Sequence, residues 1–351
     1  MQVKVEALIL KPGDSLASRN IEDYPEGIII PIDKPYRWTS ADVIRKVKFA
    51  AIRHFGKKNL KVGHAGTLDP LATGVLLVCI GKATKLAEEL QSHDKEYIAG
   101  VTFGATTPSY DLEKEIDRFF PYKHITEEGV RAALPPFIGE QDQIAPLFSA
   151  KSVDGVRAYE LARKLYKSVG QSNSDDPRLS DDRHPLAGGG MSSPLHPSHS
   201  QDSSSEIDEA AKELIRVSKI TISELELMEY QSFSDADGVE NDLANDCITS
   251  PAPCSPEGNT VFKPAISENG NASSRINVTD NSALGLPRAV IRMACSKGTY
   301  VRAFARDLGE ALGTGAHLDA LQRSRSGIFR VEAALSIEDA IQAFAPLTPK
   351  S

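Results

Sequence analysis

Asp69 lies in a glycine-rich run that leads into an apolar segment, Gly63-His64-Ala65-Gly66-Thr67-Leu68-Asp69-Pro70-Leu71-Ala72-Thr73-Gly74-Val75-Leu76. An Asp-Pro pair among glycines is typical of a tight turn and by itself needs no function. The apolar run from Val75 to Ile80 predicts a buried strand, so the turn delivers Asp69 to the start of that strand. A carboxylate held in this way can attack an electrophilic carbon or stabilise a developing positive charge.

A nucleotide-binding loop is a second interpretation of this region, because Gly81-Lys82-Ala83-Thr84 looks like part of a phosphate cradle. The spacing argues against it. Six residues separate Gly74 from Gly81 instead of four, and Ala83 stands where a Ser or Thr should follow Lys82. The glycines therefore favour a shaped turn around Asp69 over a phosphate site.

The run from Gly63 to Leu76 resembles the signature GHxGTLDPxAxGVL of the TruB family of pseudouridine synthases, and all nine fixed positions from Gly63 to Gly74 agree. Counterparts of the family's other motifs follow in order: DKPxGxTS in Asp33–Ser40, KxY in Lys95–Tyr97, PxxSAxKxxGxxxY in Pro146–Tyr159, SKGTYIR in Ser296–Arg302, DLG in Asp307–Gly309 and GAHL in Gly315–Leu318. The resemblance covers most of the chain outside two polar segments, 168–210 and 232–287.

The resemblance implies an enzyme that isomerises uridine 55 in the T-loop of tRNA to pseudouridine, with the target base flipped out of the stack. Asp69 is then the catalytic nucleophile, and Arg302 is the arginine that orients it through a charge-assisted pair. Tyr97 is expected to stack on the target base and is a candidate to move a proton, although a phenol with a pKa near ~10 is a poor base. Without the family, Arg302 would pass as a surface arginine and Tyr97 as a core tyrosine.

Four further residues match substrate-binding positions of the family. His64 is expected to help occupy or open the space in the RNA that the flipped base leaves. Tyr300 and Leu321 are expected to line the base pocket, and Lys34 to contact the substrate. Each of them would otherwise pass as an ordinary core or loop residue.

The reaction that the resemblance implies breaks a C–N glycosidic bond and forms a C–C bond on the same ribose, without redox change or net hydrolysis. We therefore expect no cofactor and no metal. The four cysteines form no CxxC pair, which argues against a zinc site and a disulfide framework and fits a reducing compartment.

Three departures from the family pattern concern contacts with RNA. Arg37 stands where the first motif prefers Gly, and Gln322 stands in a Leu-Arg-Arg type sequence. The segment Thr107–Asp111 keeps only the T-x-[ST]-x-D outline of a flexible segment that grips RNA. None of the three lies within the Asp69 loop, so they question RNA contacts and not the reaction.

The elements expected around these residues mix strands and helices without strict alternation. Apolar and β-branched runs predict strands at 27–33, 75–80, 97–103, 215–228 and 289–295. Periodicity and capping residues predict helices after Thr39 or Ser40 up to Gly56, near 83–90, at 126–134, 156–167 and 300–312, and from Ser336. The pattern favours an α+β fold with a largely antiparallel mixed sheet flanked by helices, as in a pseudouridine-synthase-like catalytic domain.

Two segments are predicted to be disordered acidic inserts, 168–210 and 232–287, since they lack apolar periodicity and each carries a net charge of −6. The whole chain carries −8, so its other 252 residues carry +4 and a nucleic acid remains a possible partner. We therefore expect an N-terminal extension at 1–26 and a catalytic domain formed by 27–167, 211–231 and 288–351.

tRNA, bound through its T-loop, is the expected partner, and we expect a cytoplasmic monomer without an obligate protein partner. Residues 1–10 resemble neither a signal peptide nor a transit sequence, and no apolar run approaches the ~20 residues of a membrane span. The chain ends about 20 residues after Arg330, so we expect no C-terminal PUA domain.

Two other functions stay open from the sequence. The first is a non-catalytic RNA-binding or tRNA-folding protein, against which the intact set of Asp69, Tyr97 and Arg302 argues. The second is the dyskerin-like subunit of a guide-RNA particle, which would be expected to have a PUA domain and basic tails.

Overall fold

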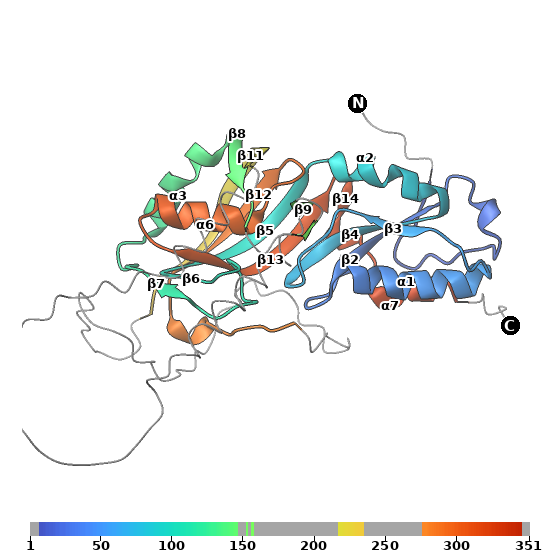
Figure 1. Ribbon diagram of the computed structural model, residues 1–351, viewed down its shortest axis with the longest axis horizontal. Helices are drawn as coiled ribbons and strands as arrows, with labels where there is room; N and C mark the ends of the chain where they lie inside the picture. The colour runs from blue at the N-terminus through green and yellow to red at the C-terminus, as the bar shows by residue number, and fades with distance from the viewer. Residues whose placement is uncertain (1–6, 147–151, 154–155, 158–216, 235–275, 346–351) are drawn as a thin grey trace, which may run out of the picture. The chain divides into compact units, whose positions relative to one another are not determined.

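The computed structural model describes residues 7–146, 152–153, 156–157, 217–234 and 276–345 (Figure 1). The chain divides into two units, one formed by Met1–Gln143 with Lys219–Ser351 and the other by Ile144–Ser218. In the second unit, the short strands β9 (Ser152–Val153) and β10 (Val156–Arg157) pair antiparallel. The hydrophobic core lies in the first unit.

A ten-stranded mixed sheet forms the centre of the first unit. Its strand order is β1-β2-β4-β13-β5-β12-β11-β8, and β3 and β14 pair with β4 and β13. The pairs β1–β2 and β4–β13 are parallel, whereas β2–β4, β3–β4, β13–β5, β5–β12 and β12–β11 are antiparallel. These strands are β1 (Leu8–Ile9), β2 (Ile28–Lys34), β3 (Val62–Ala65), β4 (Ala72–Ile80), β5 (Lys95–Phe103), β8 (Gly139–Ile144), β11 (Val217–Gln231), β12 (Arg288–Cys295), β13 (Ala316–Ser326) and β14 (Phe329–Arg330). The predicted α+β fold with a largely antiparallel sheet is confirmed.

The helices flank this sheet, and a separate pair of short strands, β6 (Ala105–Thr106) and β7 (Arg118–Phe119), lies outside it. The α-helices of the first unit are α1 (Ser40–Phe55), α2 (Ala87–Ser92), α3 (Glu127–Ala133), α6 (Val301–Ala311) and α7 (Ile337–Gln342). The 3₁₀ helices are η1 (Ile21–Asp23), η2 (Gly81–Leu86), η3 (Pro135–Phe137), η5 (Ser282–Leu284) and η6 (Val331–Ala333). As predicted, Thr39 caps α1 and Gly56 ends it in the left-handed region.

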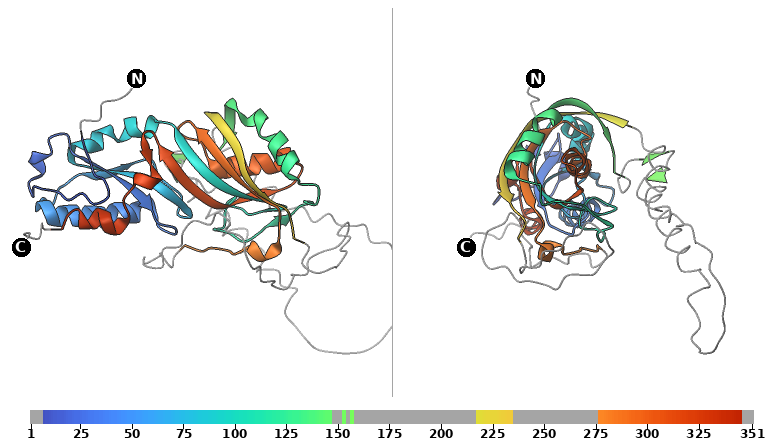
Figure 2. Two further views of the ribbon diagram at one scale, coloured as in Figure 1. Left: turned by 180° about the vertical axis from the view of Figure 1, so that it is seen from behind. Right: turned by 90° about the vertical axis from the view of Figure 1, so that its left-hand side faces the viewer.

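Both faces of β4 are covered, which explains why every residue of this strand is buried. Leu76 shares one hydrophobic cluster with Val43 of α1, whereas Leu77 points to the opposite face and shares another cluster with Leu90 of α2. In Figures 1 and 2, α1 and α7 lie side by side on one face of this half of the sheet, and α6 packs on β13 and β5 in the other half. The Asp69 turn enters β4 where the two halves meet.

Four elements differ from the sequence prediction. β13 and β8 were not expected, because their polar and charged residues interrupt any apolar run. β3 lies in a segment expected to be loop. The helix predicted at 156–167 is wrong at Val156–Arg157, which form β10, and its remainder lies outside the described residues.

The predicted N-terminal extension is also wrong for its described part, because that part belongs to the sheet and core. Leu8 and Ile9 pair with Ile28 and Ile29 of β2, and Leu10 is 2% exposed. β1 therefore forms the edge of the sheet, and the fold begins well before residue 27.

The predicted inserts lie largely outside the described residues, including all of 168–210. Both ends of the second predicted insert are described; they form a hydrogen bond with each other, and the second end also forms one with the body. The Ser234 amide donates to the Gly285 carbonyl, and the Thr279 amide donates to the Leu112 carbonyl. The described parts of this predicted insert are thus 232–234 and 276–287, and 235–275 lies outside the described residues.

The backbone at Arg37 explains why the family pattern has glycine at this position. Its φ of 62° lies in the left-handed region that favours glycine. Its amide donates to the Pro70 carbonyl, and its guanidinium donates to the carbonyl of Ile276. An arginine is less favourable than glycine in this conformation, but its side chain forms a hydrogen bond to residue 276 that glycine could not form.

We predict that Gly74→Ala destabilises the protein by at least ~3 kcal/mol, because φ at Gly74 is +98° and a Cβ there would lie 2.2 Å from the Arg323 carbonyl oxygen. Gly56→Ala is the matched control, with φ of +63° and nothing within 4 Å of the added Cβ. It should cost only ~1 kcal/mol. Urea unfolding measures both variants, and equal losses would contradict the tight approach of β4 and β13.

Candidate active site

An ion pair joins the predicted nucleophile to the predicted arginine. The Nε atom of Arg302 lies 2.9 Å from Oδ2 of Asp69. Arg302 stands in the first turn of α6 and its side chain is 5% exposed, whereas that of Asp69 is 39% exposed. The guanidinium is therefore fixed inside the protein, while the carboxylate remains open to a ligand.

A second carboxylate and a carbonyl hold the other side of this guanidinium. Arg302 Nη1 donates to the Ser109 carbonyl at 3.1 Å and lies 3.7 Å from Oδ2 of Asp111. The Ser109 hydroxyl in turn donates to Asp111 at 2.6 Å. Thr107–Asp111, interpreted from the sequence as an RNA-gripping segment, thus has its three motif side chains buried and serves to hold Arg302.

The charge of Arg302 is secured by its two carboxylate neighbours. Burial alone would lower its pKa, but Asp69 and Asp111 outweigh burial and the pKa is raised. The guanidinium thus stays charged across the ordinary pH range and can orient Asp69 throughout it.

A small pocket opens beside this ion pair. Its lining combines Asp69 and Arg302 with two further carboxylates, Asp111 and Asp319, and with the apolar side chains Leu71, Ala72, Leu112, Leu318, Ala320 and Leu321. The cavity volume is about 20 Å³, enough for about one water molecule. A nucleobase could enter only by displacing some of these side chains. Leu321, expected from the sequence to line a base pocket, is one of the residues that line this one.

Arg323 holds the turn that carries Asp69, and it is not among the site residues predicted from the sequence. It is 1% exposed, and its guanidinium donates to the carbonyls of Val75 at 2.7 Å, Thr67 at 3.2 Å and Gly66 at 3.3 Å. β13 pairs with β4 only up to Gly74, so the next carbonyl of β4, that of Val75, would otherwise face the gap between them. In the sequence, the only sign of its importance is that it follows Gln322, which departs from the family pattern.

Lys34 is fully buried, and its ammonium donates to the carbonyls of Pro35, Trp38 and Pro70 at 2.9, 2.6 and 3.2 Å. This position does not suit the predicted role in binding substrate. Pro70 follows Asp69 directly, so Lys34 instead fixes the turn from the side opposite Arg323. Burial lowers the pKa of Lys34 to about 7, against the opposing charges of Asp69 and Asp33.

Tyr97 lies on β5 directly across from Arg323 of β13 and is 9% exposed. Burial raises the pKa of its phenol, although the charge of Arg323 opposes the rise, so the hydroxyl remains protonated and is a poor base. His64 lies on β3, half-buried, and burial followed by the charge of Arg323 lowers its pKa. Both residues thus lie near the Arg323 guanidinium, and neither lines the pocket of Asp69.

Tyr300 is the N-cap residue of α6, two positions before Arg302. Its amide donates to the Gln143 side chain at 2.8 Å, and its carbonyl accepts from the same side chain at 3.1 Å. It does not line the pocket of Asp69, contrary to the expectation from the sequence. Its backbone instead fixes the start of the helix that presents Arg302.

The described residues contain no group of three or more His, Cys, Asp or Glu side chains placed to bind a metal. In the same part of the chain, no helix is long and apolar enough to cross a membrane.

Comparison with known families matches residues 53–172 to the TruB family pseudouridylate synthase N-terminal domain and residues 302–347 to the tRNA pseudouridylate synthase B C-terminal domain. The tRNA pseudouridine synthase B of Phocaeicola vulgatus is 40% identical over 316 residues, which cover 90% of this chain and 92% of that protein. The Bacteroides fragilis enzyme of the same name is 38% identical over 313 residues, covering 89% and 92%.

A chain in the crystal structure of a Cbf5-Nop10-Gar1 complex is similar over 94% of this chain. The identity is 20% and the TM-score 0.48, and this chain spans 58% of the length of that one. So distant a likeness carries no conclusion about partners or substrates.

We predict that Arg323→Met destabilises the protein by about 3–5 kcal/mol, because the buried carbonyls of Val75 and Gly66 and the carbonyl of Thr67 lose their donor. The matched control is Arg325→Met on the same strand, where the half-buried guanidinium donates to the Gly327 carbonyl, and it should cost ~1 kcal/mol or less. Arg323→Lys keeps the charge without the planar fork and should fall between the two. Urea unfolding provides the measurement, and similar losses for Arg323→Met and Arg325→Met would refute the positioning role.

The lowered pKa of Lys34 predicts that the free energy of unfolding depends on pH. An unfolded lysine has a pKa of about 10.4, so between pH 7 and pH 10 the unfolded chain holds a proton that folded Lys34 has released. Stability from this group therefore rises with pH across that window. We expect the advantage of the native protein over Lys34→Met to grow by about 1 kcal/mol per pH unit from pH 7 to pH 9.

Urea unfolding at pH 7, 8 and 9 measures this difference, with Lys11→Met as the control because Lys11 is exposed. A difference between native and Lys34→Met protein that stays constant with pH would show that Lys34 is charged in the folded state at all three values.

Proposed function

The chain belongs to the TruB family of pseudouridylate synthases, and from this premise we propose that it converts uridine 55 in the T-loop of tRNA to pseudouridine, with Asp69 as the catalytic carboxylate. The observation that carries the proposal is the ion pair between Asp69 and buried Arg302 at the mouth of a pocket. The relatives with the name tRNA pseudouridine synthase B support tRNA as the substrate.

In the reaction, the bond between C1′ of the ribose and N1 of the base breaks, and C1′ then bonds to C5 of the same base. C5 loses a proton and N1 gains one, so no atom is added from outside. Asp69 can assist by attacking the substrate or by stabilising positive charge on the ribose, because its carboxylate is half-exposed and held by Arg302.

The pocket supports a role for base flipping. Apolar side chains such as Leu321 and Leu71 offer surfaces for the two faces of a ring, and the carboxylates offer acceptors for a ring N–H. Since the free volume holds only about one water molecule, the entry of the base must be coupled to movement of lining residues. Four lining residues belong to no strand or helix: Asp69 and Leu71 in the turn before β4, and Asp111 and Leu112 after β6.

Tyr97 and His64 act in this proposal from behind the pocket lining. Tyr97 reaches the base by stacking after the pocket opens, in keeping with its protonated phenol. His64 occupies the RNA position that the flipped base leaves. The remaining expectations, a cytoplasmic monomer that needs no cofactor and no protein partner, stay predictions.

We predict that Asp69→Asn lowers the rate of pseudouridine formation at least ~10³-fold, because the amide is neither a nucleophile nor a charge. Its affinity for tRNA should stay within about threefold, since most binding comes from other contacts. The measurement is mass spectrometry of a tRNA transcript after incubation, with position 55 identified by sequencing the modified RNA.

Asp94→Asn is the matched control, because Asp94 is an exposed aspartate, and it should retain full activity. Activity of Asp69→Asn above trace contamination would refute the catalytic assignment. If the native protein forms pseudouridine at another position of the tRNA, the proposed reaction is supported and the assignment to uridine 55 is refuted.

A further inference from the structure

A second pocket lies at the end of β3 and β4 remote from Asp69. Val62 of β3 pairs with Ile80, the last residue of β4, whereas Asp69 lies just before Ala72, the first. This pocket is open and has a volume of about 560 Å³. Its lining includes Lys48, Lys58, Lys61, Val62, Gly63 and Thr84.

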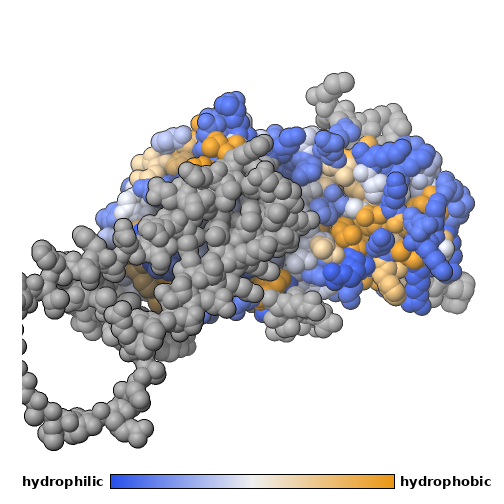
Figure 3. Space-filling model, in the orientation of Figure 1, coloured by the Kyte–Doolittle hydropathy of each residue, from blue (hydrophilic) through white to orange (hydrophobic). Residues whose placement is uncertain are grey.

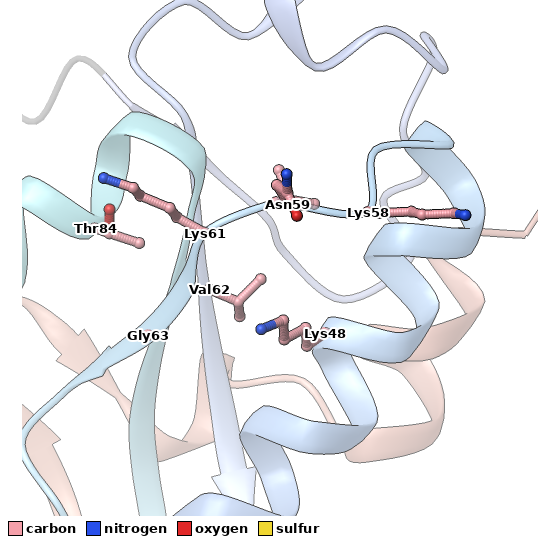
Figure 4. Close-up of a pocket in the computed structure, with 8 residues that line it drawn as sticks. Lys48, Lys58, Asn59, Lys61, Val62, Gly63 and Thr84 are labelled. Carbon is pink, nitrogen blue, oxygen red and sulfur yellow. The ribbon is translucent and has the colours of Figure 1, made fainter.

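The lysines of this pocket come from different elements. In Figure 4, Lys48 points from α1 towards Val62. Lys61, which directly precedes β3, points towards Thr84 of η2. Lys58 belongs to the connection after α1 and points away from both. Two ammonium groups therefore flank the start of β3, and a third lies at the rim.

The charge around this pocket is one-sided. Residues 41–63 contain seven lysines and arginines and one acidic residue, Asp42; the cations are Arg45, Lys46, Lys48, Arg53, Lys57, Lys58 and Lys61. This net charge of +6 exceeds the +4 of the whole chain without its predicted inserts. The basic character of the body is therefore concentrated in α1 and the connection to β3.

Two neighbouring cations have carboxylate partners, whereas the pocket lysines have none among the described residues. Lys57 pairs with Glu22 at 2.8 Å, and Lys82 pairs with Glu26 at 3.8 Å. Within the described ranges, no carboxylate lies within 4 Å of Lys48, Lys58 or Lys61. Three like charges gathered without a counter-charge in the protein favour an anionic ligand.

The strand edge beside these lysines adds a polar backbone group. The Gly81 amide donates to the Lys61 carbonyl, which makes these two residues a hydrogen-bonded pair of the antiparallel ladder. By the alternation of such ladders, the amide and carbonyl of the next residue, Val62, face away from β4. Among the described strands β3 pairs only with β4, so this edge is open to a ligand.

An aromatic side chain is exposed on the same helix. Phe49 follows Lys48 and is 72% exposed, with Arg45 and Arg53 one helical turn away on either side. Figure 3 shows exposed hydrophobic residues bordered by hydrophilic ones on the half of the molecule where α1 and β3 lie. A surface that combines cations with an exposed ring fits a nucleic acid, whose phosphates and bases can use both.

We propose that this pocket binds the phosphate backbone of the substrate RNA at a point remote from the target nucleotide. The nine residues of β4 separate the two sites, which at ~3.3 Å per residue places them on the order of 25 Å apart. That separation is too large for one nucleotide, so the contact lies in another part of the folded RNA. The inference rests on the proposed function for the identity of the RNA.

The test replaces the three lysines together, in the variant Lys48→Gln/Lys58→Gln/Lys61→Gln of the full chain. A second variant, Lys11→Gln/Lys123→Gln/Arg330→Gln, removes the same charge from exposed positions elsewhere and serves as the control. Binding is measured by filter binding or fluorescence anisotropy from 0.05 to 0.3 M salt. The two RNAs are a full tRNA transcript and a hairpin that contains only the T-loop and three base pairs.

The pocket variant should bind full tRNA ~10-fold more weakly at 0.1 M salt, and its slope of log affinity against log salt should fall by about 2. Its affinity for the short hairpin and its single-turnover rate at saturating enzyme should stay within about twofold. A loss no larger than that of the control variant overturns the proposal, and so does an equal loss with both RNAs.

These binding measurements separate the pocket from the proposed function. Native protein that binds tRNA with the expected pocket dependence, but forms no pseudouridine, would refute the function and retain the RNA site. Native protein that forms pseudouridine, with tRNA binding indifferent to the three lysines, would refute only the site.

Discussion

Strand β13 pairs with β4 over only three residues, Leu321–Arg323, and the active site depends on how the backbone groups are satisfied where the strands part. The carbonyls of Val75, Thr67 and Gly66 turn into this gap, and a buried carbonyl without a donor costs about 1–3 kcal/mol. The Arg323 guanidinium supplies donors to all three. The same side chain therefore closes the gap in the sheet and fixes the turn that presents Asp69.

Three buried cations surround this turn, and each has a different partner. Arg323 and Lys34 donate to backbone carbonyls on opposite sides of it, whereas Arg302 alone pairs with the carboxylate of Asp69. A buried cation is costly unless hydrogen bonds compensate it, and the lowered pKa of Lys34 reflects that cost. The result is a turn held from within the protein while its carboxylate, at 39% exposure, faces outward. Rigidity and access are thus provided by different groups.

The sequence predicts elements whose signals are local and fails where the cause is distant. β2, α1 and β4 follow from apolar runs and a capping residue, and the importance of Asp69 follows from a run of adjacent residues. β13 escapes such reasoning because its polar residues find partners far away in the chain; for example, Asp319 pairs with Arg288. Lys34 shows a different limit, since a lysine inside a motif looks like a ligand contact until its three carbonyl partners are known, and two of these, Pro35 and Trp38, are near it in the sequence.

The acidic total charge of the chain, −8, conceals a basic segment that the sheet connects directly to the active site. β3 and the turn after it run from the pocket lysines to Asp69 without an intervening insert, and β4 returns beside them. The spacing of the two sites is therefore set by strand geometry and varies little. A ligand that fills both must present its target nucleotide at a fixed distance from its own phosphate backbone, which a folded RNA does and a flexible strand does not. The proposed RNA contact therefore selects by shape, even if no side chain reads a base outside the pocket.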